Sequence, residues 1–328
     1  MSSLGMNSRG EVRTASEFKD MFDDTGISAS PYKCPFCEVL YVDKCIVTEC
    51  VKAPHFGLVP KGEAHRNGCN GEATDSGVVT TSKPSRAPKG IVAGDIDLPE
   101  ALVSRRNPTR LRQPGGDDNG PPPDVTEVRR RRRIVVGDPT IQSCFTTYNI
   151  RNIVEAYKRL RSKVHDAAVA LGQSPGTDEY KKTFRASLEF HPLVLKKVKL
   201  NYRIAFSNSK LFPSRDNRIY SGNGTILIDD KFIVIQDNDV WPATFERTKS
   251  APLTVRIART LPPESPTTHA RALAELEQLA LEQKPIDWWA YGTATLHHDR
   301  FEILVESFDH LYWKNQYNPS ARSTQPES

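Results

Sequence analysis

The chain has 328 residues, of which 38% are hydrophobic and 26% are charged, and it contains 24 prolines and 19 glycines. This length accommodates two domains and a connection between them, while the proline and glycine content excludes a chain that is packed throughout. The formal net charge of +5 is too small to establish a nucleic-acid partner by itself. The distribution of charge along the sequence therefore matters more than its sum.

The N-terminal segment 1–30 is polar and lacks the apolar run that a secretory signal needs. Later segments fall short of the roughly 18 consecutive apolar residues of a membrane-spanning helix. We therefore expect a soluble, cytoplasmic protein with a flexible N-terminus. One short amphipathic piece in this segment surrounds Phe18, Met21 and Phe22.

Five of the six cysteines lie between residues 34 and 69, together with two histidines. In a chain without a secretory signal, this crowding favours metal binding over disulfide bonds. The segment 31–78 has the composition of a small domain that cannot build a sufficient core unaided. A bound metal ion would supply the missing stability.

The spacing of these residues predicts one structural Zn²⁺ site. Cys34 and Cys37 are separated by two residues, so both thiolates can reach one ion from a tight turn. His65 and Cys69 stand four apart, as on one side of a helical turn, and can complete a tetrahedron. His55 competes with His65 for the histidine position, because the intervening loop can bring either one in. Four protein ligands leave no position for water, so we expect a structural ion and not a catalytic one.

The remaining cysteines and histidine of this segment have simpler interpretations. We interpret Cys45 and Cys50 as small apolar residues in strands, in preference to a second metal site. If His65 is the ligand, His55 is a partly buried histidine beside Phe56.

The motifs CPFC, PHF and HRNGC resemble the N-terminal zinc-binding module of many uncharacterised bacterial proteins. They are similar, more loosely, to the zinc-ribbon-like start of the competence CoiA family. The resemblance implies a bacterial or mobile-element context and nucleic-acid-related work, with characteristic positions at Cys34, Cys37, His55, His65 and Cys69. CoiA-like proteins also carry a nuclease-like domain, but this chain lacks an Asp followed by a spaced Glu-x-Lys on adjacent strands. Nuclease activity is therefore not carried over.

Residues 79–140 are rich in proline, glycine and charge and show almost no periodic apolar pattern, which predicts a disordered linker. Its most concentrated charge is the run Arg129, Arg130, Arg131, Arg132 and Arg133. In a flexible segment, five guanidinium groups can spread along a phosphate backbone. The alternative is a solvated run of charge that keeps the linker extended, and the two interpretations stay equally open.

Regular apolar periodicity returns in the segment 141–315, which we expect to be an α+β domain ahead of a disordered tail, 316–328. Helical periodicity predicts helices over 150–172, 178–190 and 268–283, the last capped by Thr267 or Thr268. Alternation predicts strands over 202–206, 218–228, 231–236, 253–259, 289–296 and 300–306. Short strands suggest a small bent antiparallel sheet or a partly closed barrel of the oligonucleotide-binding (OB) type, with Gly222 and Gly224 as bulges.

Several aromatic residues of these strands stand close to basic residues. On a curved sheet, exposed aromatic rings can stack on bases while neighbouring cations meet phosphates. Tyr220 and Tyr291, each followed closely by glycine, are the rings that we expect to be exposed, with Arg300 as a cation. The alternative is ordinary core packing. Trp288 and Trp289 point to opposite sides of a strand, so we expect one of them to be exposed.

No P-loop, dinucleotide fingerprint, HExxH or GxSxG motif is present. The sequence thus predicts a bacterial, zinc-containing protein that binds nucleic acid or acts as an adaptor without catalysis. Two alternatives remain: a degenerate nuclease or defence-system enzyme, and a module that binds a protein partner.

Overall fold

The computed structural model describes residues 2–48, 50, 52–71, 96–112, 121–138, 140–141, 145–208, 216–242, 250–297 and 300–315. The chain divides into two compact units, unit 1 (Met1–Arg203) and unit 2 (Ile204–Ser328). The described residues form a mixed α and β fold with six α-helices and three sheets. Among them, no helix is both long and apolar enough to cross a bilayer. The predicted tail, 316–328, lies outside the described residues.

The first sheet of unit 1 is antiparallel and has the strand order β5-β4-β3-β1-β2-β7. Its strands are β1 (Leu4–Met6), β2 (Glu11–Thr14), β3 (Tyr32–Lys33), β4 (Leu40–Lys44), β5 (His55–Leu58) and β7 (Thr109–Arg110). Residues from the segment 1–30 thus supply two inner strands, and the expectation of a flexible N-terminus is wrong. The physical reason is burial, since Met6 and Val12 are both 0% exposed.

Helix α1 (Ala15–Thr25) follows β2 directly and accounts for the amphipathic piece in the sequence. A capping box starts it: Thr14 Oγ1 accepts from the Glu17 amide (3.1 Å), and Glu17 Oε2 accepts from the Thr14 amide (2.8 Å). Gly26 ends it in the left-handed conformation, at φ 68°. Phe18 packs edge-on against Tyr32, with ring centroids 4.9 Å apart, and joins α1 to the core.

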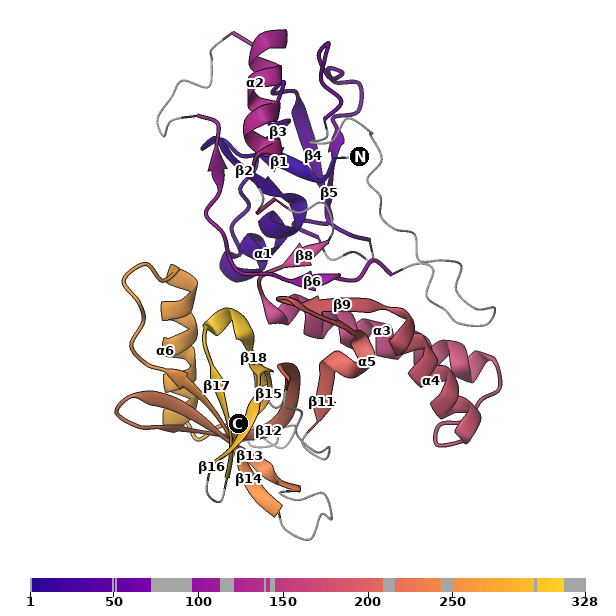
Figure 1. Cartoon of the computed structure of the whole chain (residues 1–328), viewed down its shortest axis with the longest axis vertical. Helices are drawn as coiled ribbons and strands as arrows, with labels where there is room; N and C mark the ends of the chain where they lie inside the picture. The colour runs from indigo at the N-terminus through magenta and orange to yellow at the C-terminus, as the bar shows by residue number, and fades with distance from the viewer. Residues whose placement is uncertain are drawn as a thin grey trace, which may run out of the picture. The chain divides into compact units, whose positions relative to one another are not determined.

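Helix α2 (Val125–Val136) lies within the segment that we expected to be a disordered linker. Asp124 caps it, with Oδ1 accepting from the Glu127 amide at 2.8 Å. Val128 and Val135, seven residues apart on one helix face, are buried in the same core as β1–β5. Figure 1 shows α2 beside these strands. The linker expectation is therefore corrected for the residues of α2 and for 96–112, which include β7 and a further paired strand at Ala101–Leu102. Residues 79–95, 113–120 and 139 lie outside the described residues.

The second sheet of unit 1 has the order β10-β9-β6-β8. Its strands are β6 (Ala101–Leu102), β8 (Thr146–Thr147), β9 (Pro192–Leu195) and β10 (Val198–Asn201). Two predicted helices are confirmed as α3 (Ile150–Ala170) and α4 (Asp178–Phe190), and α4 ends just before His191-Pro192. These elements belong with the N-terminal residues in unit 1, so the expected start of a C-terminal domain at 141 is displaced to the boundary at 203–204.

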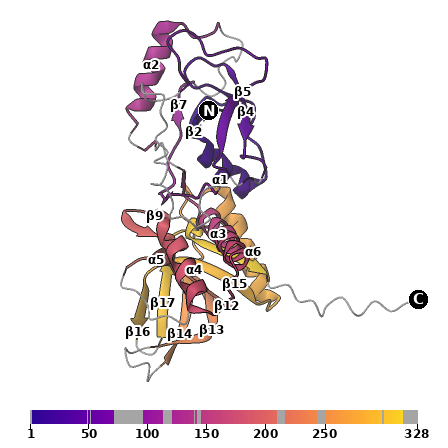
Figure 2. The ribbon, with the colours of Figure 1, turned by 90° about the vertical axis from the view of Figure 1, so that its right-hand side faces the viewer.

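Unit 2 contains one sheet with the order β16-β17-β14-β13-β12-β15-β18, in which β11 also pairs with β12. Its strands are β11 (Phe206–Asn208), β12 (Arg218–Ile228), β13 (Phe232–Pro242), β14 (Ser250–Ala258), β15 (Ile286–Gly292), β16 (Ala294–His297), β17 (Arg300–Val305) and β18 (Leu311–Asn315). Figure 2 shows β16, β17, β14 and β13 side by side in this order. The predicted strand over 202–206 is instead the short helix α5 (Tyr202–Ala205) leading into β11.

None of the described sheets closes into a barrel, so the OB-type expectation is wrong. After β14, the chain adds β15 beside β12 and β17 beside β14, the latter pair being parallel. The sheet therefore grows at both sides and leaves β16 and β18 as its edges. This open order depends on long-range strand pairing, which the alternation within single strands does not specify.

Helix α6 (Thr267–Leu281) covers one face of this sheet, and Leu276 and Leu279 join the core that contains Trp288. Neither Thr267 nor Thr268 caps it, because the N-cap position is Pro266, which offers no side-chain hydrogen bond. A 3₁₀ helix, Phe308–His310, precedes β18.

Gly222 and Gly224 are not bulges, since β12 pairs with β15 without interruption from Arg218 to Gly224. The irregularity lies on β13, between Gln236 and Val240. A Cβ at Gly222 would overlap the Asp237 carboxylate and come within 2.8 Å of the Trp288 ring. Glycine is needed here for close approach of neighbouring side chains.

The buried carboxylate of Asp237 makes the stability of unit 2 dependent on pH. Burial raises the pKa of Asp237 to about 6. Because the folded-state pKa lies above the unfolded value, the protonated acid contributes stability at low pH, and this contribution is lost as pH rises through 6. We expect the unfolding free energy of unit 2 to fall by up to about 3 kcal/mol between pH 4 and pH 7.5.

Replacement of Asp237 by Asn should remove this pH dependence while keeping the oxygen that accepts from the Asp239 amide (2.7 Å). Urea unfolding followed by tryptophan fluorescence measures it, since all four tryptophans lie in unit 2. Equal pH slopes for wild type and Asp237→Asn would contradict the assignment.

Candidate metal centre

Four side chains gather in unit 1 with their ligand atoms within 4.8 Å of one another: Cys34, Cys37, His65 and Cys69. The first two come from the turn between β3 and β4. The Glu38 amide donates to the Cys34 carbonyl (3.0 Å), and the Cys34 amide donates to the Val39 carbonyl (2.8 Å), which closes the turn tightly. Glu38 adopts φ 63°, a conformation that turns the chain directly after the second cysteine.

His65 and Cys69 approach from the other side on a second turn, in which the Cys69 amide donates to the Arg66 carbonyl at 2.9 Å. The Gly71 amide donates to Cys69 Sγ at 3.4 Å. A Cβ at Gly71 would lie 2.6 Å from His65 Nε2, so only glycine leaves room for this imidazole. The ring is thereby held with Nδ1 facing the sulfurs.

The spacing of these atoms fits a tetrahedral ion. Zinc bonds of about 2.3 Å to sulfur and about 2.0 Å to nitrogen place two sulfurs about 3.8 Å apart and a nitrogen about 3.5 Å from a sulfur. Cys34 Sγ lies 3.6 Å from Cys69 Sγ. His65 Nδ1 lies 3.4 Å from Cys37 Sγ and 3.7 Å from Cys69 Sγ. These three distances are close to those of a tetrahedral site, so the four residues are compatible with one bound metal ion.

The electrostatics of the cluster are compatible with a bound cation. Burial raises the pKa of the Cys34 thiol, and the neighbouring thiols raise it further. Hydrogen bonds from Cys34 and Cys69 lower the pKa of Cys37. Hydrogen bonding to Cys37 and to Cys69 raises the pKa of His65 to about 9. A divalent ion supplies the positive charge that allows all three sulfurs to ionise together.

The site is closed on its inner side by the core of unit 1. Cys34 and Cys37 are both 0% exposed. Tyr41 meets the His65 ring edge-on, with centroids 5.8 Å apart, and stacks on Phe56 at 5.6 Å. These rings fix the imidazole and keep water from the inner side of the cluster.

The other candidates of this segment lie elsewhere. His55 is on β5, and its Nδ1 is 2.9 Å from the Ala53 carbonyl oxygen, so it is not part of the cluster. Cys45 and Cys50 are not two strand residues: they form a disulfide across a loop that begins where β4 ends, with Cα atoms 5.3 Å apart. This pairing corrects our interpretation, and it leaves the cluster thiols as a separate group.

Helix α2 is joined to the first ligand turn by buried charges that the sequence analysis did not identify. Arg131 Nη1 donates to Glu38 Oε1 at 2.5 Å, and Arg112 Nε donates to the same oxygen at 3.2 Å. Arg131 also donates through Nε to Glu127 on its own helix (2.7 Å). Glu38 directly follows Cys37, and this adjacency was the only available signal for its role.

The five arginines of the run do not act alike, because α2 separates them by face. Arg131 is 7% exposed and faces the core, whereas Arg129, Arg130 and Arg133 are exposed. Arg132 is half-buried, with its guanidinium 5.9 Å from the Phe36 ring centroid. The expectation of five arginines spread along a flexible segment is therefore corrected.

The aromatic residues predicted to be exposed in the C-terminal sheet are buried. Tyr220 is 0% exposed and Tyr291 is 4% exposed. Tyr220 is paired with Ala290, the residue before Tyr291, so the two rings point to opposite faces of the sheet. Arg300 is exposed on β17, which is not paired with β12 or β15 in the sheet. These three residues do not form one surface.

The two adjacent tryptophans follow the expected alternation only in part. Trp288 is 0% exposed, and Trp289 is half-buried and stacks on Tyr312 with ring centroids 5.4 Å apart. Neither ring is therefore an open stacking platform.

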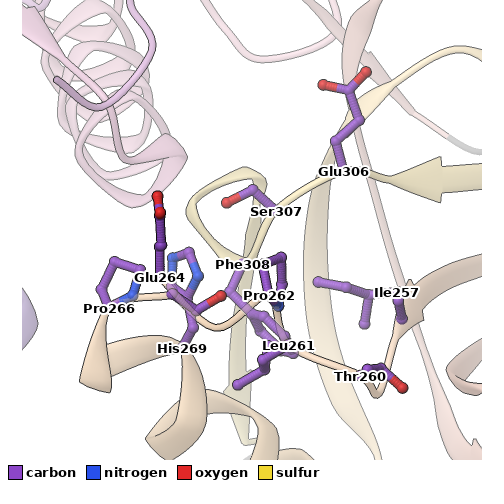
Figure 3. Close-up of a pocket in the computed structure, with 12 residues that line it drawn as sticks. Ile257, Thr260, Leu261, Pro262, Glu264, Pro266, His269, Glu306, Ser307 and Phe308 are labelled. Carbon is purple, nitrogen blue, oxygen red and sulfur yellow. The ribbon is translucent and has the colours of Figure 1, made fainter.

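Unit 2 contains a separate cavity of about 330 Å³ between the loop after β14 and the start of α6 (Figure 3). His269 lines it, with Nε2 3.1 Å from Asp309 Oδ1 and its ring beside Phe308. The two members of this pair are 40 residues apart in the sequence, and no spacing signal predicts it. The remaining lining combines apolar side chains with two carboxylates and three hydroxyl groups, those of Glu264, Glu306, Thr260, Ser265 and Ser307.

Comparison with known proteins finds no protein-family model that matches this chain and no curated protein that matches its sequence.

Proposed function

We propose that this chain is a zinc-stabilised protein that binds nucleic acid through the exposed arginines of α2. The observation that carries this proposal is the division of the helix into two faces. Val128, Arg131 and Val135 are buried, whereas Arg129, Arg130 and Arg133 are exposed on the opposite face. An ordered helix that turns several guanidinium groups to solvent is suited to contact successive phosphates.

The donor set supports zinc as the ion. Three thiolates and one imidazole are soft and borderline ligands, which suit Zn²⁺ and do not suit Mg²⁺ or Ca²⁺. Four protein ligands leave no position for a reactive water, so the ion would stabilise the fold of this module without taking part in a reaction. The residues that would hold it are Cys34, Cys37, His65 and Cys69.

The exposed arginines of α2 would bind nucleic acid through its phosphate charges, without preference for a base sequence. Contacts to phosphate position a protein on nucleic acid but carry no sequence information. Arg130 is already paired with Glu127 (2.7 Å), but this pair is exposed and contributes little, so it does not prevent a phosphate contact. We therefore expect binding that is similar for unrelated sequences of equal length and steeply dependent on salt.

The test is to measure binding of single-stranded and duplex oligonucleotides by fluorescence anisotropy at several salt concentrations. Replacing Arg129 and Arg133 by Gln should lower the slope of log affinity against log salt by roughly 0.7 to 0.9 for each arginine that pairs with a phosphate. The matched control replaces Arg159 and Arg185 by Gln. These arginines are exposed on α3 and α4, so the control makes the same change in net charge elsewhere in unit 1.

If wild type fails to bind even at low salt, nucleic-acid recognition is excluded as the function. A protein partner then becomes the leading candidate, favoured by Ile134 and Val136, which are exposed beside the arginines at 39% and 60%. Cleavage of the oligonucleotide on addition of Mg²⁺ would instead favour the degenerate nuclease.

A further inference from the structure

We infer that the metal ion controls the docking of α2, so that loss of the ion releases this helix and the arginines that it presents. The effect on nucleic-acid binding rests on the proposed function. The release itself rests only on the contacts between α2 and the two turns that carry the ligands.

The first turn reaches α2 through Glu38, the residue directly after Cys37. Its carboxylate accepts from Arg131 at 2.5 Å, and the side chains of Glu38 and Arg131 are only 14% and 9% exposed. Arg112 forms a second ion pair with the same carboxylate. A half-buried carboxylate between two guanidinium groups holds its geometry only while the turn that carries it stays in place.

The second turn reaches the N-terminal end of the helix. Gly68, between His65 and Cys69, has φ 81°, and a Cβ at this position would touch Val125 Cγ1 at 3.6 Å. On the first turn, Phe36 lies between the two cysteines and faces Arg132. Helix α2 therefore contacts the first ligand turn through Glu38 and Phe36 and begins close to Gly68 of the second turn, and the ion would join the two turns to each other.

Besides these contacts, the helix is held by two valines that pack into the core of unit 1. It is 12 residues long, and its buried residues are Val128, Arg131 and Val135. Isolated helices of about 12–15 residues are marginal in water, so most of the stability of α2 must come from packing. Without an ion, the ligand side chains of the two turns are joined by weak sulfur hydrogen bonds, such as Cys34 Sγ to Cys69 Sγ (3.6 Å) and Cys37 Sγ to His65 Nδ1 (3.4 Å). We expect the surface beneath α2 to loosen before the rest of unit 1.

Limited trypsin digestion of the full chain tests this directly, because α2 carries five consecutive cleavage sites at 129–133. Zinc-loaded protein is compared with protein stripped by a chelator under reducing conditions, and early cuts are mapped by mass spectrometry. We expect stripping to speed cleavage in α2 by at least about tenfold, since cleavage follows the population of the open form. Cleavage in α3 and α4 of the same unit should change much less.

Two variants locate the coupling. Glu38→Gln weakens the link between the ligand turn and Arg131, so α2 should be cut faster even in zinc-loaded protein whose metal content is unchanged. Glu127→Gln is the matched control, because it removes pairs within α2 and leaves the contact with Glu38 intact. It should have a clearly smaller effect than Glu38→Gln.

The inference is overturned if stripping leaves cleavage of α2 unchanged, or if it speeds cleavage of α1, α2 and α3 equally, which would make the ion a support for the whole unit. It is also overturned if Glu127→Gln matches Glu38→Gln. Anisotropy measured in parallel separates the two proposals. If stripping releases α2 but leaves the affinity for oligonucleotides unchanged, only the proposed function is contradicted. If the Arg129→Gln/Arg133→Gln variant binds more weakly but stripping does not release α2, only this inference is contradicted.

Discussion

Protein purified without a metal-affinity column is expected to contain about one zinc ion per chain, and Cys34→Ser or Cys69→Ser is expected to lose it. Each substitution removes a thiolate from a cluster whose ligand atoms all lie within 4.8 Å. The remaining three ligands would leave an incomplete tetrahedron, while the binding energy of such an ion is also folding energy. The measurement is elemental analysis combined with circular dichroism.

The matched control for these variants is Cys45→Ser, which changes the same atom in a residue of the same unit. Cys45 is bonded to Cys50 and is not part of the cluster, so this variant should keep its zinc. His65→Ala should lose the ion, whereas His55→Ala should retain it. Retention of zinc by Cys69→Ser, or its loss from His55→Ala, would show that the ligand set is wrong.

Replacement of Asp20 by Ala is expected to lower the unfolding free energy of unit 1 by about 3–5 kcal/mol. The Asp20 side chain is 1% exposed and accepts from Thr147 Oγ1 (2.8 Å), the Tyr148 amide (3.0 Å) and Asn152 Nδ2. It thereby joins α1 to β8 and α3. Its removal takes away the acceptor of the buried Tyr148 amide and of the partly buried Asn152 Nδ2, whereas Thr147 Oγ1 can still donate to the Asn149 carbonyl (3.1 Å).

Asp23→Ala is the control on the same helix. Asp23 pairs with Lys19 at 3.0 Å in an i,i+4 arrangement, which contributes about 0.3–0.5 kcal/mol. Urea unfolding followed by far-ultraviolet circular dichroism measures both variants. Tryptophan fluorescence, which reports on unit 2 alone, should change little in either. A similar loss of unfolding free energy for Asp20→Ala and Asp23→Ala would show that the hydrogen bonds of Asp20 do not stabilise unit 1 as expected.

Several features of this protein could be predicted from the sequence because they depend on neighbouring residues. The helices α3 and α4 follow from apolar side chains three or four apart, a pattern that one helix face imposes whatever it packs against. The strands β12 and β13 follow from alternation of apolar side chains, and the short turn between them is closed locally by Asp229, whose carboxylate accepts from the Phe232 amide at 2.6 Å. The four residues of the metal cluster could be named because two ligand pairs must each come from a tight turn.

Other features were decided by contacts between distant segments. The segment 1–30 is polar overall, yet a few apolar side chains place it inside the first sheet of unit 1. From the sequence, the arginine run is indistinguishable from a solvated run of charge. In the structure, α2 packs on the core and Arg131 pairs with Glu38, which is 93 residues away in the sequence. The composition of a segment does not say which of its residues are buried. In the folded protein, the burial of each residue depends on the face of the helix or strand on which it lies.

The sequence by itself therefore determined α3, α4, most strands of unit 2 and the ligand pairs, whereas α2, α5 and the choice of buried faces were decided by the tertiary structure. Tyr220 and Tyr291 show the difference: alternation places both on strands, but only the pairing of β12 with β15 sets them on opposite faces, and both are buried. The open order of the sheet in unit 2 has the same origin. Strand pairing and burial are set by long-range packing, because each strand can satisfy its own period of two with many partners.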